Sequence, residues 1–151
     1  MDNIDLQILS ILKDNARMKA SAIANVVNLS VSAVTERIKK LETSGIIEKY
    51  TLMVDQKKIG NDVSAVIEVA IEHPRYIDSF INLVTSIPNI ISCYCVTGDY
   101  DFILKVIIDS SEGLEQIYRM VKGFEGVKET KTYIILKNIK NEITLLPEEA
   151  N

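Results

Sequence analysis

Apolar residues with helical spacing form three short stripes within the first 45 residues. The first stripe follows an i, i+4, i+7, i+8 pattern, which is typical of an amphipathic helix, and the other two are shorter. The stripes comprise Ile4, Ile8, Ile11 and Leu12, then Ala20, Ile23, Ala24 and Val27, and finally Val34, Ile38 and Leu41. The triplet Asn28-Leu29-Ser30 separates the last two, Ser30 is a favourable N-cap, and Gly45 suits a helix end. Three helices with a three-residue turn before the last predict a helix-turn-helix domain.

The third predicted helix carries the candidate DNA contacts. Its polar side has small side chains near the N-terminus, as close approach to a groove floor requires, and longer basic ones further on, where phosphates lie. The candidate DNA-binding residues are Ser30, Ser32, Ala33, Thr35, Glu36, Arg37, Lys39 and Lys40. The same pattern suits a solvated helix of a three-helix bundle, but the preceding turn favours a DNA-binding domain. This predicted helix-turn-helix domain is called the reader below.

Residues 46–54 are β-prone and predict a short hairpin or wing, then a strand that leaves the domain. Residues 55–62 are polar, contain Gly60 and lack periodicity, which indicates a hinge linker. We therefore expect a DNA-binding domain over residues 1–54, a linker over 55–62 and a second domain over 63–151.

The second domain alternates strand and helix patterns. Strands are predicted over 63–71, 90–97, 101–108 and 127–136, with one helical stripe before Pro88 and another before Gly123. The order β-α-β-β-α-β predicts a ferredoxin-like sandwich, a four-stranded antiparallel sheet with both helices on one face, and an α+β protein overall.

The sheet face away from the helices is also expected to be apolar. Its predicted members are Val66, Ile90, Val96, Ile103, Ile107, Tyr133 and Ile135. Such a face is not left to water, so we expect a second subunit to cover it in a symmetric dimer.

Charge divides unevenly along the chain. Residues 1–50 contain seven Lys and Arg against six Asp and Glu, and the remainder contains ten against fifteen, which gives net charges of +1 and −5. A slightly basic reader on an acidic remainder fits this division, although one unit of charge is weak evidence. No apolar run reaches the roughly 18–20 residues of a membrane helix, and the acidic start lacks a signal-peptide layout, so we expect a cytoplasmic protein.

Cys93 and Cys95 are the two cysteines, and they stand one residue apart in a predicted strand. This spacing points both thiols to one face and matches neither a Cys-x-x-Cys redox motif nor a zinc set. We expect buried, inert thiols, and no metal or cofactor.

Several motifs in the same order resemble the leucine-responsive/asparagine-responsive (Lrp/AsnC) family of transcriptional regulators. In the reader they are Asp5-x-x-Ile8-Leu9, Asn15-Ala16-Arg17, Val27-x-Leu29-Ser30 and Arg37-Ile38-x-x-Leu41-Glu42-x-x-Gly45-Ile46-Ile47-x-x-Tyr50. In the second domain they are Val96-Thr97-Gly98-Asp99-Tyr100-Asp101 and Thr130-x-Thr132. The resemblance implies dimers, often assembled into octamers, that bind promoter DNA and hold small effectors, usually amino acids, between subunits. The chain departs from the family at the start of the second helix. It has Lys19 and Ala22 where many members have a Ser cap and a Glu. The loss of this capping box should weaken the second helix by about 1 kcal/mol.

The resemblance also points to an effector site. Gly98 permits a loop that offers N–H groups to a carboxylate, carboxylates can meet an ammonium group, and threonine hydroxyls can bond either end of a zwitterion. The candidate residues are Gly98, Asp99, Tyr100, Asp101, Thr130 and Thr132. A plain hairpin turn at Gly98-Asp99 is the alternative. The hypothesis for regulation is that an effector favours one assembly state and so changes the spacing or number of DNA readers.

Two other functions are compatible with parts of the pattern. Some tetrapyrrole-processing decarboxylases resemble the family in fold, but they are expected to use histidines, and the one histidine here, His73, stands in a Glu-His-Pro turn at a strand end. An amino-acid-binding oligomer that no longer reads DNA is disfavoured by Arg37, Lys39 and Lys40. We therefore expect a regulator rather than an enzyme.

Overall fold

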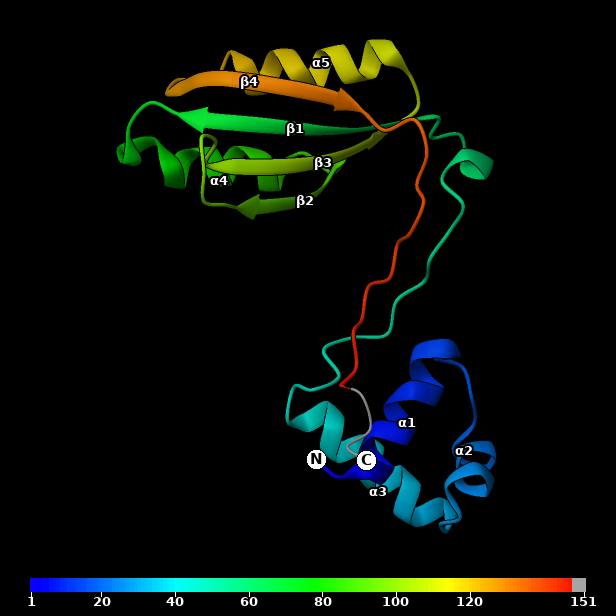
Figure 1. The fold of residues 1–151 in the computed structure, drawn as a ribbon. Coiled ribbons are helices and arrows are strands. Elements are labelled where there is room, and N and C mark those ends of the chain that lie inside the picture. The colour runs from blue at the N-terminus through cyan, green and yellow to red at the C-terminus, as the bar shows by residue number, and fades with distance from the viewer. Residues whose placement is uncertain (148–151) are drawn as a thin grey trace. The chain divides into compact units, whose positions relative to one another are not determined.

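The structure is a computed structural model that describes residues 1–147. It divides into two units (Figure 1). Of the described residues, one unit comprises Met1–Met53 together with residues 140–147, and the other comprises Val54–Ile139.

Three helices form the first unit: α1 (Asn3–Asp14), α2 (Ala20–Val27) and α3 (Val31–Thr43). The predicted stripes supply their core, in which Ile8, Ile23 and Val34 are fully buried. Residues 140–147 accompany this unit, and Lys13 Nζ lies 3.4 Å from Glu142 Oε2. Residues 140–147 therefore group with the three helices rather than with the sheet.

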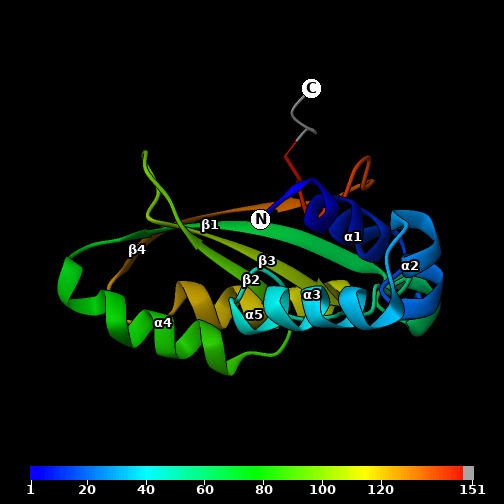
Figure 2. The same ribbon diagram turned by 90° about the horizontal axis from the view of Figure 1, so that it is seen from below.

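A four-stranded antiparallel sheet forms the second unit. Its strands are β1 (Val63–Ile71), β2 (Ile90–Cys95), β3 (Phe102–Ile108) and β4 (Val127–Ile134), in the order β2-β3-β1-β4. Both helices, α4 (Ile77–Ser86) and α5 (Ser111–Lys122), lie on one side of the sheet, as Figure 2 shows. This arrangement confirms the predicted ferredoxin-like α+β fold.

The helix-covered face of this sheet holds the core of the second unit. Alternate residues of β1 and β3 are buried there against α4 and α5, and the ring of Phe80 on α4 lies 5.1 Å from that of Phe102. The buried strand residues are Ala65, Ile67 and Val69 on β1 and Phe102, Leu104 and Val106 on β3.

The opposite face, called the open face below, has no helix on it. Register places Val66, Ile103, Ile107 and Tyr133 on this face, as predicted, together with Glu68, Lys105 and Lys131. Ile90 is a correction, because it pairs with Val106 and packs against the helix-side core. The register shifts between Ile90 and Ser92, and this irregularity reverses the side expected from simple alternation.

Two predicted segments differ from expectation. Residues 46–54 form no strand or hairpin in the described chain, and Leu52 is 82% exposed. A segment becomes a strand only when a neighbour completes its hydrogen bonds, and no segment among residues 1–147 does so here. The linker 55–62 is more ordered than expected, because Lys57–Ile59 is a 3₁₀ turn and Asp55 Oδ1 accepts the Lys57 N–H at 3.1 Å.

The prediction of buried cysteines is wrong. Cys93 and Cys95 are both exposed. They pair with Leu104 and Phe102 and so share one face, but β2 is the outermost strand and the helices do not cover them. Among the described residues, no helix has the length and apolar character needed to cross a membrane.

Candidate DNA-binding and effector-binding sites

The turn between α2 and α3 sets the direction of the candidate recognition helix. Asn28 ends α2 in the left-handed conformation, with φ 53° and ψ 45°. Ser30 then caps α3, since its Oγ accepts the Ala33 N–H at 3.2 Å. At the start of α2, the N-cap residue Lys19 makes no side-chain capping bond, so the capping box that many family members have is absent.

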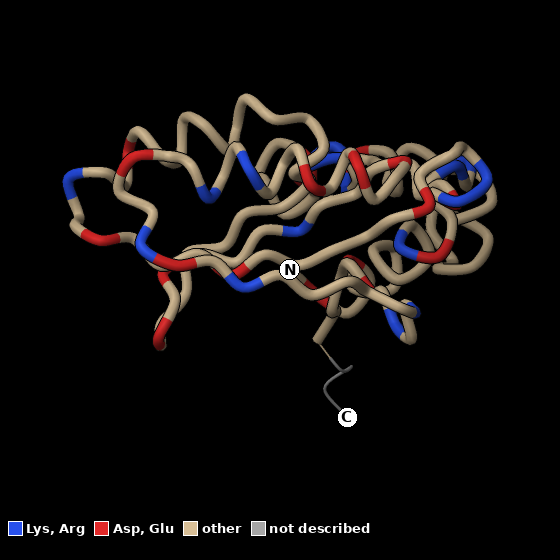
Figure 3. The backbone as a smooth tube through the Cα atoms, turned by 90° about the horizontal axis from the view of Figure 1, so that it is seen from above, with Lys and Arg blue, Asp and Glu red and all other residues tan. Residues whose placement is uncertain are grey.

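Most of the candidate DNA-binding residues lie on the outer side of α3. Val34 and Leu41 are buried on the inner side, which turns the polar side outward. Ser30, Ser32, Thr35, Glu36, Lys39 and Lys40 are exposed, and Ala33 is half-buried. The Thr35 hydroxyl donates to the Val31 carbonyl at 2.8 Å, so its methyl group is the part turned away from the helix backbone. Figure 3 shows Lys and Arg interspersed with Asp and Glu along the backbone.

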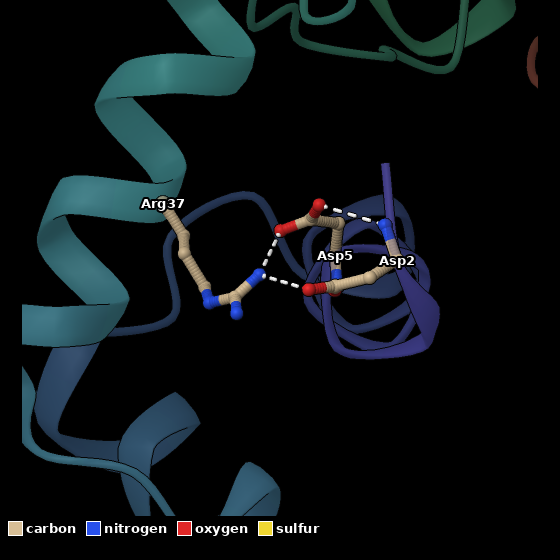
Figure 4. A network of polar contacts seen from close by, with 3 residues as sticks. All are labelled: Asp2, Asp5 and Arg37. Carbon is tan, nitrogen blue, oxygen red and sulfur yellow. Dashed lines mark hydrogen bonds and ion pairs between the residues drawn. The ribbon is translucent and has the colours of Figure 1, made fainter.

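Arg37 differs from the other candidates because it is engaged within the chain. Its Nη1 lies 2.8 Å from Asp2 Oδ2 and 2.7 Å from Asp5 Oδ1 (Figure 4). Asp2 and Asp5 also form a capping box at the start of α1, each accepting the backbone N–H of the other. The two carboxylates therefore anchor α3 to α1 through Arg37.

The electrostatics of this cluster follow from its contacts. The Asp5 backbone N–H, and then the Arg37 guanidinium, lower the pKa of Asp2 below its ordinary value of 3.8. The hydrogen bonds to Asp2 and Asp5 raise the pKa of Arg37, which stays charged. The sequence does not reveal this role of Asp2 and Asp5, because acidic residues at a helix start are also favoured by the helix dipole alone.

The candidate effector loop lies between β2 and β3. Gly98 has φ +128°, a conformation that other residues rarely adopt. Asp101 ties the loop to β1, because its carboxylate accepts the Ile71 N–H at 2.6 Å and its own N–H donates to the Val69 carbonyl at 2.9 Å. The Tyr100 hydroxyl lies 3.4 Å from Glu129 Oε1 on β4.

The loop borders a depression on the open face. Asp99 and Tyr100 line it, whereas Gly98, Asp101, Thr130 and Thr132 do not. The other lining residues are Glu68, Cys95, Val96, Thr97, Ile103, Lys131 and Tyr133. Of these, Glu68 and Lys131 were not predicted as site residues, although strand alternation already indicated that they share a face with Tyr133.

Thr130 and Thr132 lie on the other face of the sheet. They pair with Val69 and Ile67, whose side chains point toward the helices. Both Oγ1 atoms are buried, and neither makes a hydrogen bond within the described part of the chain. A buried hydroxyl without a partner costs about 1–3 kcal/mol, so these two groups are available to a polar partner. One chain does not bring the loop and the threonines to one face.

Comparisons with known proteins cover nearly the whole chain. Residues 1–48 match the family model of a winged helix-turn-helix DNA-binding domain, and residues 64–145 match that of the Lrp/AsnC ligand-binding domain. The chain is 35% identical to the HTH-type transcriptional regulator FL11 of Pyrococcus furiosus over 97% of this chain and 96% of that protein. It is 34% identical to the regulator LrpC of Bacillus subtilis over 92% and 94% of the two chains. A crystal structure of a transcriptional regulator from Neisseria meningitidis in complex with L-Met superimposes with a TM-score of 0.92 at 26% identity, covering 97% of this chain and 96% of that one.

Proposed function

The chain belongs to the Lrp/AsnC family of helix-turn-helix transcriptional regulators, and on that premise we propose that it binds promoter DNA through α3 and responds to an amino-acid-like effector held between subunits. The observation that carries the DNA-binding half is the outward polar side of α3, directed by the Asn28 turn and the Ser30 cap. In this proposal the protein acts as a regulator and catalyses no reaction.

The size and exposure of each α3 side chain indicate which part of the DNA it would contact. Ser32, Ala33 and Thr35 are small, and they allow the N-terminal part of α3 to approach base edges, where Glu36 can accept from a cytosine amino group. Lys39 and Lys40 are exposed, and they suit phosphates. Arg37 supports this surface by holding α3 against α1 through Asp2 and Asp5.

The DNA-binding proposal is tested with a duplex obtained by selection from a random library with the full chain. Fluorescence anisotropy should show weaker binding by the Lys39→Gln and Lys40→Gln variants, with a shallower dependence of affinity on salt concentration. Lys128→Gln, an exposed change on β4, is the matched control. If the α3 variants bind as the parent does, α3 is not the DNA-contacting helix.

The effector proposal rests on the two half-sites described above. The loop at 98–101 offers backbone groups and the carboxylate of Asp99 at one place, since Asp101 is already bonded to β1. The unpaired hydroxyls of Thr130 and Thr132 lie on the other face of the sheet. A zwitterion needs both kinds of group. Apposition of the loop from one subunit and the threonines from another would unite them, which supports a site between subunits. The complex of the Neisseria relative with L-Met supports an amino acid as the ligand class.

A thermal-stability screen of the full chain against each of the twenty amino acids tests the effector proposal. An amino acid at 100 times its dissociation constant should add about 2.7 kcal/mol of stability. Sedimentation velocity at that concentration should then show a change in the populations of dimer and larger assemblies, octamers included. A tenfold change in DNA affinity with unchanged assembly populations would contradict the assembly mechanism. No response to any amino acid would contradict the effector itself.

A symmetric dimer is the third part of the proposal. The open face carries Val66, Ile103 and Ile107 on its two central strands, with Tyr133 at 44% exposed on β4. A second copy of the sheet buries these side chains, and a two-fold axis makes the contact self-complementary. The extended residues 46–54, with exposed Leu52 and Met53, are free to pair in the same assembly.

A further inference from the structure

The two unpaired hydroxyls on β4 have polar neighbours on α5. This helix lies beside β4 (Figure 1), and Tyr118 and Lys122 stand about one helical turn apart on it. The Lys122 ammonium donates to the Tyr118 hydroxyl at 2.9 Å. Thr130 and Thr132 are on the same, helix-covered face of the sheet, because they pair with core residues of β1.

Thr130 lies next to the Tyr118 hydroxyl. The hydrogen bond from Lys122 lowers the pKa of Tyr118 below its ordinary value of 10.0, and Thr130 is close enough to act in the same direction. The Thr130 Oγ1 nevertheless completes no hydrogen bond among the described residues, and neither does that of Thr132. Tyr118, Lys122, Thr130 and Thr132 therefore form one group of side chains, called the α5–β4 cluster below.

Every side chain of the α5–β4 cluster can donate a hydrogen bond, and one of them is a cation. The Tyr118 oxygen accepts from Lys122, so the phenol hydrogen is free to donate, and the ammonium keeps further hydrogens. Lys122 is exposed and makes no ion pair with the residues that the structure describes. Glu115 of the same helix is paired with Arg119 instead, at 2.7 Å. Such a set of donors suits a carboxylate, whose oxygens only accept.

The loop at 98–101 provides for the other end of an amino acid. In the proposed site its backbone N–H groups receive the α-carboxylate, and Asp99 receives the α-ammonium. The α5–β4 cluster is then left to the side chain of the effector. An apolar side chain would leave the buried hydroxyls unpaired, and a basic one would meet Lys122 as a like charge. A side-chain carboxylate satisfies the hydroxyls and the ammonium together.

We propose that the effector is an acidic amino acid, aspartate or glutamate, whose side-chain carboxylate is bound by Lys122 and Tyr118 together with the hydroxyls of Thr130 and Thr132. The inference rests on the amino-acid site of the proposed function. It adds the chemical class of the effector and two residues on α5 that select it. The amides have the same shape as the acids but lack the charge, so they lose the charge-assisted bonds to Lys122 and are bound more weakly.

Calorimetric titration of the full-length chain tests the class of effector. The probes are sodium L-glutamate, sodium L-aspartate, L-glutamine, L-asparagine, L-leucine and L-lysine, with sodium chloride as the control for ionic strength. The preferred acidic amino acid should bind about tenfold or more tightly than its own amide, as expected for hydrogen bonds to a charged group. It should also bind more tightly than leucine and lysine.

Substitutions on α5 test the residues. Lys122→Gln should weaken binding of the preferred acidic amino acid by about tenfold or more, and Tyr118→Phe, which keeps the ring, should weaken it by a smaller factor. Lys122→Glu should reverse the preference, so that L-lysine binds more tightly than the acidic amino acid. Lys57→Glu, an exposed change of the same charge, is the matched control and should bind as the parent does. Because Lys122 is exposed, its variants should melt at the parent's temperature without effector.

The outcomes separate the inference from the proposed function. If a neutral or basic amino acid binds and the acidic ones bind no more tightly than their amides, the effector class is wrong while an amino-acid site remains. If Lys122→Gln binds the acidic amino acid as the parent does, the α5–β4 cluster does not hold its carboxylate and the inference is overturned. If no amino acid binds, the effector site of the proposed function is wrong as well.

Discussion

The guanidinium of Arg37 lies 2.7 Å from the carboxylate of Asp5, and this contact joins the recognition helix to the first helix of the reader. Asp5, 32 positions away in sequence, thus holds the Arg37 side chain, which the helical pattern alone places among the DNA contacts. The arginine is a positioning residue, and the free cations of the helix are Lys39 and Lys40.

Salt dependence distinguishes these two roles. Arg37→Gln should weaken binding to a selected duplex by displacing α3 while leaving the slope of log affinity against log salt concentration unchanged. Lys40→Gln should reduce the magnitude of that slope by about 1, because one phosphate contact is lost. Anisotropy titrations from 50 to 300 mM salt measure both slopes. A reduced slope in Arg37→Gln would show that the arginine contacts phosphate in the complex.

The same cluster makes the reader sensitive to acid. The pKa of Asp2 is lower in the folded chain than its ordinary value of 3.8, so the carboxylate stabilises the fold above about pH 4. This stabilisation is lost as the pH falls from that value through the lowered pKa. Thermal melts between pH 2 and pH 6 should therefore show a steeper loss for the parent than for Asp2→Asn, which cannot titrate. Parallel curves would indicate that Asp2 is not held by Arg37 and the Asp5 N–H in solution.

The cap of the recognition helix has a measurable energy. Ser30→Ala removes the acceptor of the Ala33 N–H and should lower the free energy of unfolding of the reader by about 1 kcal/mol. Urea denaturation of the full chain measures the loss. Ser21→Ala, at an exposed position on α2, serves as the control and should be close to neutral. Equal stability of both variants would argue against the Ser30 cap.

Removal of an unpaired hydroxyl on β4 should raise the stability of the protein, whereas loss of the Ser30 cap lowers it. Thr132→Val keeps the shape of the side chain and removes a buried hydroxyl without a partner, so the effector-free protein should gain about 1 kcal/mol of stability. The stabilisation by the active amino acid should shrink in the same variant. Thr85→Val, whose hydroxyl is exposed and bonded to the Ile81 carbonyl, should give no gain. A destabilised Thr132→Val would mean that the hydroxyl already has a partner in the free assembly.

Much of the architecture follows from residue periodicity. The stripes through Ile8, Ile23 and Val34 place the reader helices, and the alternation through Ile67 and Leu104 places the central strands, because each apolar face has to be buried. Local composition carries these features, so a single sequence suffices to predict them.

The features that escaped prediction depend on contacts distant in sequence. Ile90 changes sides because the β2–β3 register shifts beside it, and Cys93 is exposed because its strand lies at the sheet edge. The partner of Arg37 lies at the other end of the reader. Thr130 and the loop at Gly98 were grouped by their chemistry, which contains no information about the face of the sheet on which each lies.

Sequence-specific DNA binding by the full-length chain is the measurement on which the regulator assignment depends most. The dissociation constants for a selected duplex and for the same duplex with its sequence scrambled should differ by about 10³-fold or more at physiological salt. This difference between the two dissociation constants should disappear when Ser32 and Thr35 on α3 are both replaced by bulkier Gln, because the helix no longer approaches the base edges. Equal affinity of the parent for the selected and scrambled duplexes would contradict a sequence-specific regulator.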